Sequence, residues 1–333
     1  MTNVGSLATK PLFGLPLAEL WFALLFFIFG MFLFLDGFDF GVGVLFATRD
    51  TDHEKEQLLA AVGPFWDGNE VWLVVFGGAL FAAFPSVYAN LFSRYYLLMF
   101  AILATLGLRG LAPEMYEERE SDRWRQLWGY SFIVGSTGTP FLLGLFVINW
   151  LVGATDLITP AGLLGGVAVL TLTVVDGAAF LGLKTRGALR EEMRSYGIGG
   201  AVSYLGVAIL TLGTIYLTEP GLRPSFRSPI VVALVTLTAT LTGIYVVALR
   251  RRRYYAAFTA IAALVFGLVG LVAILLFPFV DRTAGLTIRD AIVSTLPLNL
   301  MSIMASVLIP IVLVYFVVLY SAFSGPIDAE ETY

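Results

Sequence analysis

The sequence predicts an all-α integral membrane protein with about nine transmembrane helices. Of its 333 residues, 58% are hydrophobic and only 13% are charged, and the mean hydropathy is +0.86. A soluble domain carries roughly 25% charged residues. Charge-free runs on the scale of the roughly 20 residues that cross a bilayer recur along the chain. Lipid is therefore the environment that fits this composition.

The charge-free runs place the helices in order. We expect them near residues 20–46, 69–91, 94–112, 128–151, 161–183, 199–218, 229–249, 256–279 and 300–324. The last run is long, and it contains Pro297 and Pro310, which are candidates for breaking it.

A short internal echo suggests how these helices are grouped. Asp36 and Asp176 are each followed by glycine, near the ends of the first and fifth helices. Internal repeats of this kind are common in membrane proteins. We therefore expect a first bundle of four helices over residues 1–155, and a second bundle plus one extra helix over residues 156–333.

The distribution of basic residues predicts the orientation. The third helix end and the loops after helices one, three, five and seven hold 14 of the 20 Lys and Arg residues, and the opposite side holds 6. Cytoplasmic loops carry the excess of basic residues. The N-terminus is then expected outside and the C-terminus in the cytoplasm. The net charge of −4 does not suggest a nucleic-acid partner.

The residue inventory excludes several kinds of site. The chain has no cysteine, which rules out disulfides, thiolate zinc sites and iron–sulfur clusters. It has one histidine, His53, in a charged segment where a solvated loop residue is expected. A haem held between two histidines cannot be built from this chain alone.

Acidic residues inside the first helix point to a buried polar site. Asp36 and Asp39 have the i, i+3 spacing that places them on one helical face. An ionised Asp at the bilayer centre costs roughly 2.5–3.5 kcal/mol. Gly37 and Gly41 would let another helix approach closely. The carboxylates could relay protons or hold a cation. The alternative is a helix end where both Asp residues meet cytoplasmic water.

A second polar cluster, GPFWDGNEVW at residues 63–72, precedes an apolar run. Asp67 and Glu70 have the spacing of a capping box at the start of a helix. Trp66 and Trp72 could anchor that helix at the membrane surface. The physics of local structure favours this account; the functional alternative is a partly buried polar opening into the membrane.

Arg109 ends the third predicted helix. Snorkelling of its guanidinium to the cytoplasmic surface is the expected behaviour. An ion pair with one of the intramembrane Asp residues is the alternative.

Several of these motifs together resemble subunit II of cytochrome bd ubiquinol oxidases. The resemblance rests on LDGFDFGVG at 35–43, GPFWDGNEVW at 63–72, GGALFAAFPSVYA at 77–89, LRG at 108–110 and GLTIRDAIVSTLPLNLM at 285–301. It spans nearly the whole chain. It implies a complex that oxidises quinol and reduces dioxygen to water, with protons taken from the cytoplasm. Haem b and haem d are then expected in the partner, subunit I, and this chain binds none alone.

The resemblance also suggests roles for individual residues. Asp67 matches the best candidate for a proton path, with Asp36 and Asp39 as further carboxylates and Glu70 as a weaker one, since some relatives have Gln there. Trp72 matches a position near an apolar route for oxygen, with Trp66 beside it, and Arg109 matches a basic charge partner. A bound quinone and small accessory subunits are further options, and quinol, the lipid bilayer and subunit I are the expected partners.

Two other functions stay open on the residues alone. A secondary transporter would account for the internal repeat and the intramembrane carboxylates. A membrane scaffold that conducts no ions would account for the composition.

Overall fold

The computed structural model describes residues 4–326, and these are almost entirely helical. The elements, in chain order, are α1 (Val4–Thr9), a 3₁₀ turn (Leu12–Gly14), α2 (Leu17–Phe46), α3 (Asp52–Val62), α4 (Trp66–Ala83), α5 (Pro85–Arg94), α6 (Tyr96–Glu118), α7 (Asp122–Val152), α8 (Pro160–Lys184), α9 (Gly187–Thr218), a 3₁₀ turn (Pro220–Leu222), α10 (Arg223–Phe226), α11 (Pro229–Arg250), α12 (Tyr254–Leu276), β1 (Phe279–Asp281), β2 (Leu286–Thr287), α13 (Ile288–Ala291) and α14 (Thr295–Ala322).

Eight of the helices within residues 4–326 are long and apolar enough to cross a membrane. They are α2, α6, α7, α8, α9, α11, α12 and α14. The helix expected over residues 69–91 is instead two helices, α4 and α5, because Phe84 leaves the helical region directly before Pro85. The all-α membrane class is confirmed, and the count of nine spans stays a prediction. Pro310 lies inside α14 without ending it.

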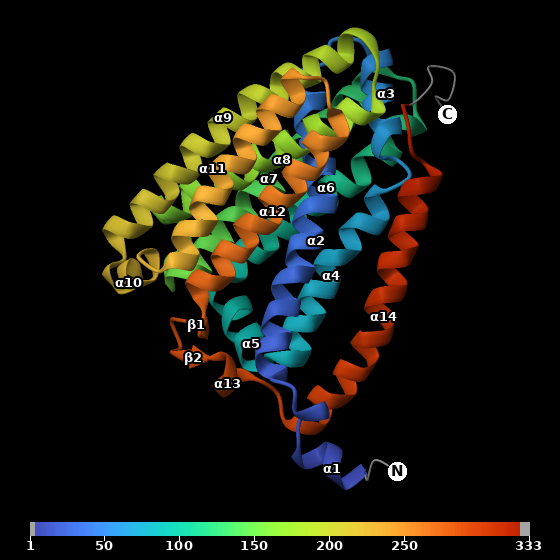
Figure 1. The fold of residues 1–333 in the computed structure, drawn as a ribbon. Helices are drawn as coiled ribbons and strands as arrows, with labels where there is room; N and C mark the ends of the chain where they lie inside the picture. Colours follow the sequence, from blue (N-terminus) through green and yellow to red (C-terminus); the bar gives the residue numbers. More distant parts are fainter. Residues whose placement is uncertain (1–3, 327–333) are drawn as a thin grey trace.

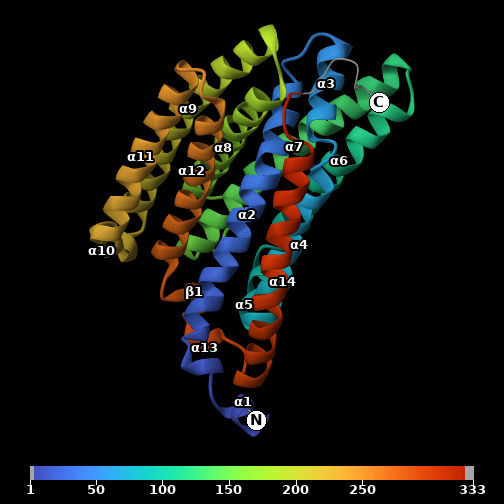
Figure 2. The same cartoon turned by 45° about the vertical axis from the view of Figure 1, so that its right-hand side comes forward.

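The helix α2 is at the centre of the molecule. It packs against α4, α7, α8 and α12, and in Figures 1 and 2 it runs between α12 and α4. Its closest neighbour is α8, which crosses it at Gly41 and Gly177. A Cβ atom added to Gly41 would lie only 1.9 Å from the carbonyl oxygen of Thr173. The glycines therefore let two backbones touch, as the small-residue spacing predicted.

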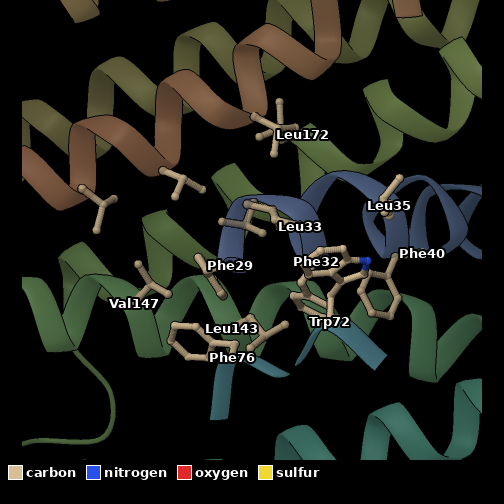
Figure 3. Packing of buried hydrophobic residues seen from close by; sticks show 14 of the residues in the cluster. Phe29, Phe32, Leu33, Leu35, Phe40, Trp72, Phe76, Leu143, Val147 and Leu172 are labelled. Atoms are coloured by element: carbon tan, nitrogen blue, oxygen red, sulfur yellow. The ribbon is translucent and has the colours of Figure 1, made fainter. Parts of the chain in front are cut away.

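Aromatic and aliphatic side chains fill the space around α2. Phe29 and Phe32 of α2 lie beside Trp72 and Phe76 of α4 (Figure 3). The rings of Phe29 and Phe76 are 5.0 Å apart, with their planes tilted by 46°. This packing fixes α4 against α2 and so positions the polar first turns of α4.

The last helix, α14, is attached mainly at its two ends. Asn299, near its start, donates to the carbonyl oxygens of Leu7 and Lys10. At its other end, Lys184 of α8 donates to the carbonyl oxygen of Phe323. Along its most apolar stretch only 6% of the residues are buried. In Figures 1 and 2 α14 runs beside α4, away from α9 and α11. The grouping into residues 1–155 and 156–333 stays a prediction.

The end of the molecule that carries α5 and the β1–β2 hairpin is closed by buried polar contacts. Asp281 of β1 accepts hydrogen bonds from Arg94 at 3.0 Å and from Asn90 at 3.1 Å. Trp150 of α7 donates to the carbonyl oxygen of Val280 at 2.8 Å. The hairpin is therefore held by side chains from α5 and α7.

The basic segments lie at the opposite end. α3, the α8–α9 turn and the α11–α12 turn are all at the top of Figure 1, while α1 is at the bottom. The last turn of α14 is also at the top. The two ends of the described chain therefore lie at opposite ends of the bundle. The orientation with the N-terminus outside and the C-terminus in the cytoplasm stays a prediction.

Candidate functional site

Two carboxylates of α2 form the core of a buried polar site. Asp36 and Asp39 are 0% exposed. The helix continues to Phe46, two turns beyond Asp39. The alternative in which Asp39 meets cytoplasmic water at a helix end therefore does not hold: its side chain lies between packed helices, not at a terminus.

Arg109 of α6 is the charge partner of both. Its Nη2 atom is 2.8 Å from Asp36 Oδ1 and 3.2 Å from Asp39 Oδ2. Snorkelling of this residue is a wrong prediction, because Arg109 is only 1% exposed. The helix α6 extends to Glu118, so Arg109 does not end the helix, and its side chain is turned into the bundle.

The first turns of α4 complete the cluster. Glu70 Oε2 is 3.2 Å from Arg109 Nη1, and the Glu70 side chain is 28% exposed. Asn69 donates through Nδ2 to Asp39 Oδ2 at 2.9 Å. It accepts a hydrogen bond from Tyr320 Oη of α14 at 2.8 Å. The cluster therefore joins α2, α4, α6 and α14.

The capping box expected at residues 67 and 70 is absent from the start of α4. The helix begins at Trp66 after Phe65, and no side chain caps it. Asp67 is an exposed residue of the first turn. Glu70 turns to Arg109 because a buried guanidinium offers it an ion pair that an exposed backbone N–H does not match.

The two tryptophans of the motif occupy different environments. The Trp66 ring lies 5.7 Å from the Arg109 guanidinium, close enough for a cation–π contact. Trp72 is 3% exposed and packs against Phe316 of α14, with ring centroids 5.8 Å apart. Neither is a simple surface anchor.

Trp72 also lines an apolar groove of about 480 Å³ between α2, α4 and α14. Ile28, Val75, Met304 and Leu308 form much of its wall. Met304, Leu308 and Phe316 supply the α14 side of this groove. It is wide enough for small apolar molecules.

Together these groups leave an excess of negative charge inside the bundle. Three carboxylates surround the single guanidinium of Arg109. Within residues 4–326, no group of three or more His, Cys, Asp or Glu side chains has the geometry to hold a metal ion. Excess charge at such depth is stabilised by bound protons. The arrangement is chemically suited to taking up and releasing protons.

Two sequence candidates lie outside the cluster. Asp176 is 0% exposed, on α8. His53 is exposed and lies in α3, not in a loop, with its Nε2 atom 3.1 Å from Gln57 Nε2.

Two members of the cluster were not singled out in the sequence. Asn69 was visible within the WDGNE motif. Tyr320 carried no local signal, because only folding brings α14 to α4.

Comparisons with known proteins match nearly the whole chain. A model of the cytochrome bd terminal oxidase subunit II family matches residues 17–323. The chain is 33% identical to cytochrome bd ubiquinol oxidase subunit 2 of Bacillus subtilis, over 95% of this chain and 98% of the relative. It is 31% identical to cytochrome bd-I ubiquinol oxidase subunit 2 of Escherichia coli K12, over 89% and 91%. In structure it resembles a chain of the bd oxidase from Geobacillus thermodenitrificans, with a TM-score of 0.77, 18% identity and coverage of 93% and 99%.

Proposed function

Because the chain belongs to the cytochrome bd terminal oxidase subunit II family, we propose that it provides a proton path and an oxygen path to a haem-bearing subunit I. The complex is a quinol:dioxygen oxidoreductase, of which this chain is one subunit. The observation that carries the proton path is the buried Arg109 cluster, which combines exchangeable carboxylates with a link to the surface.

The proposed proton path runs inward along α4. Asp67 is exposed on the first turn, and Glu70 follows one turn later with a partly exposed side chain. Glu70 and Asp39 both contact Arg109. Asp67 is therefore the proposed intake and Glu70 the step between it and the buried carboxylates. In this arrangement Glu70 has a larger role than the resemblance alone suggested.

The proposed proton intake faces the end of the molecule that carries most Lys and Arg residues, so protons would come from the cytoplasm. The N-terminus is then outside. Both points rest on charge distribution.

Asp67→Asn and Glu70→Gln test the proton path. Each is expected to slow oxygen consumption in the assembled complex several-fold, because each removes an exchangeable proton from the path. The matched control is Asp122→Asn, an acidic first-turn residue of α7 outside the cluster, and it should leave the rate unchanged. Unchanged rates in both path variants, with the complex intact, would refute the proton role.

The proposed oxygen path begins at the groove beside Trp72. Dioxygen is apolar and partitions into the bilayer, and the groove between α4 and α14 has apolar walls. Ala79→Leu, which narrows this groove, is expected to raise the oxygen concentration at half-maximal rate without changing the maximal rate. The same half-saturation value in wild type and variant would count against this route.

Subunit I is proposed to cover the exposed apolar faces of α4, α6 and α14. Val74, Leu97 and Val317 are 65–73% exposed on these helices. Exposed apolar side chains can face either lipid or a partner subunit, and cross-linking distinguishes the two. Single cysteines introduced at Val74 and at Ile209 of α9 should react differently. The first is expected to cross-link to subunit I and the second, on the far side of the bundle, is not.

The residues of this chain do not fit a haem. His53 is its only histidine and is exposed, hydrogen-bonded to a neighbouring glutamine. The haems of the complex therefore belong to subunit I, in line with the family.

A quinone bound to this chain would need a site other than the Arg109 cluster and the groove beside Trp72. An apolar cavity of about 80 Å³ lies between α2, α7, α8, α9, α11 and α12, lined by residues that include Phe29, Leu143 and Tyr204. A quinone would enter it only if the helices moved apart. Extraction of the lipids of the purified complex, followed by chromatography, tests whether a quinone is bound. Gel electrophoresis of the same complex tests for small accessory subunits.

The transporter alternative is disfavoured by continuous helices. Transporter sites commonly lie at breaks in membrane helices. Here α2 and α8 run unbroken past Asp36 and Asp176.

A further inference from the structure

Asp176 is a buried carboxyl group that the proposed proton path does not use. It lies in the middle of the molecule, on α8, with 0% exposure. Within residues 4–326, neither of its carboxylate oxygens has a hydrogen-bond donor. The guanidinium of Arg109 is paired with Asp36, Asp39 and Glu70 and not with Asp176.

The position of Asp176 leaves little room for a counter-ion. It precedes Gly177, where α8 touches the backbone of α2. A Cβ atom added to Gly37 would lie 3.2 Å from Asp176 Oδ2, so the carboxyl group rests directly on α2 beside Asp36. The neighbouring hydroxyls are committed elsewhere. Tyr245 Oη of α11 donates to the carbonyl oxygen of Val175.

An ionised carboxylate in this place would be strongly unfavourable. Burial of a lone charge costs several kcal/mol even after relaxation, whereas a neutral carboxylic acid costs far less. The simplest stable state of the group is therefore the protonated one. Asp39 lies close enough to interact electrostatically with Asp176, and its Oδ1 atom also has no partner in the described chain.

We propose that Asp176 is a second, inner proton-binding site that exchanges its proton with Asp39 of the Arg109 cluster. In the exchange an O–H bond at Asp176 breaks and one at Asp39 forms, so the total charge of the pair is unchanged. The site would let the bundle hold an additional proton on the α8 side of α2, behind the carboxylates that face Arg109.

The groups that face this site come from three helices. Asp36 and Asp39 lie on α2, Tyr245 on α11 and Tyr320 on α14, and the last two interact electrostatically with Asp176. The Tyr320 hydroxyl donates its hydrogen bond to Asn69 Oδ1 and not to Asp176. Asp36 also has carboxylate oxygens without a hydrogen-bond donor, but Asp39 is the carboxylate that interacts electrostatically with Asp176, so we assign it as the acceptor of a proton that leaves Asp176.

Infrared spectroscopy of the purified, assembled complex tests the proton directly. A protonated carboxyl group gives a carbonyl stretch that an ionised carboxylate lacks, and the band shifts to lower frequency when the proton is replaced by deuterium. We expect a band that Asp176→Asn removes. The matched control, Thr173→Val, changes a buried residue one turn earlier on α8 and should keep the band.

Exchange is tested by turnover in D₂O. The Asp176 band should shift in wild type within the time of turnover, and Asp39→Asn should slow that shift several-fold. A spectrum that Asp176→Asn leaves unchanged would overturn the proposal, as would a band that never shifts in D₂O. Should Asp176→Asn fail to assemble, Asp176→Glu replaces it, and a band at the wild-type frequency in that variant is the contradicting result.

The inference rests on the proposed proton role of the cluster for its functional meaning only. The resting spectrum reports the proton on Asp176 whether or not Asp67→Asn alters oxygen consumption. Failure of the proposed path and failure of the second site are therefore separate results.

Discussion

At the residue scale, Arg109 is the group on which the buried cluster depends. Its guanidinium contacts three carboxylates, two of which are buried. Removing one partner of a buried ion pair leaves charge that nothing compensates. The ion pairs of this cluster therefore differ in kind from those on the surface of the same protein.

Arg109→Ala is expected to destabilise the protein by about 3–5 kcal/mol, because it leaves unpaired carboxylates inside the bundle. Arg125→Ala is the matched control. Its ion pair with Glu56 is partly exposed on both sides, so a loss of at most about 1 kcal/mol is expected. Thermal unfolding in detergent compares the two. Equal losses would mean that the buried cluster contributes no more than a surface pair.

Asp281 gives the protein a dependence on acid pH. Burial alone would raise its pKa, but hydrogen bonds from Arg94, from the Ala284 backbone and from Asn90 outweigh it, and the pKa of Asp281 lies below its usual value. A carboxyl group whose pKa is lowered by folding stabilises the folded protein at pH values above its pKa in the unfolded chain, about 3.9. This stabilisation is lost as the pH falls through the pKa of Asp281 in the folded protein.

The hairpin should therefore loosen in acid. The melting temperature of the wild type is expected to fall steeply below about pH 4. Asp281→Asn should have a lower melting temperature than wild type at neutral pH, and its melting temperature should change less as the pH falls below about 4. A wild type whose melting temperature does not respond to acid would contradict the prediction.

At the scale of elements, the crossing of α2 and α8 fixes the geometry of the site. Gly41 and Gly177 bring the two backbones together. With α2 fixed in this way, Asp36 and Asp39 reach Arg109 of α6. The position of each carboxylate thus follows from where the glycines are.

Gly41→Ala is expected to destabilise the protein by about 1–3 kcal/mol, because its Cβ atom would lie 1.9 Å from the carbonyl oxygen of Thr173. Gly206→Ala of α9 is the control. No atom lies within 4 Å of its added Cβ, so a gain of roughly 0.5–1 kcal/mol from helix propensity is expected. Denaturation in detergent measures both. A tolerated Gly41→Ala would show that the helices can separate freely.

At the scale of the whole molecule, the charge distribution and the arrangement of the helices agree. The segments rich in Lys and Arg gather at one end, with α3, and the hairpin and α1 lie at the other (Figure 1). This charge distribution predicts that the end with α3 faces the cytoplasm.

Cysteine labelling tests the sidedness, because the natural chain has no cysteine. Thr283→Cys, in the hairpin, should react with a membrane-impermeant maleimide in intact cells. Arg251→Cys, in the α11–α12 turn, should react only after the cells are opened. The opposite pattern would reverse the orientation, and with it the side from which protons enter.

The sequence alone determined the class of the protein and most of its helices. Low charge and long apolar runs require lipid, and they located eight long helices to within a few residues at most ends; the start of α9 lay twelve residues earlier than expected. The motifs around Asp36 and Asp67 predicted the family, and this prediction is confirmed. These features are local, and local composition and spacing are what a sequence displays directly.

Only the tertiary structure decided which polar residues meet. Arg109 was expected at the surface and Glu70 in a capping box, yet the two pair inside the bundle. Tyr320 reaches the same cluster from the far end of the chain. Such contacts depend on how far each helix continues and how closely its neighbours approach. The sequence does not show where a helix ends to within one turn. A difference of one turn decides whether a side chain lies in water or inside the bundle.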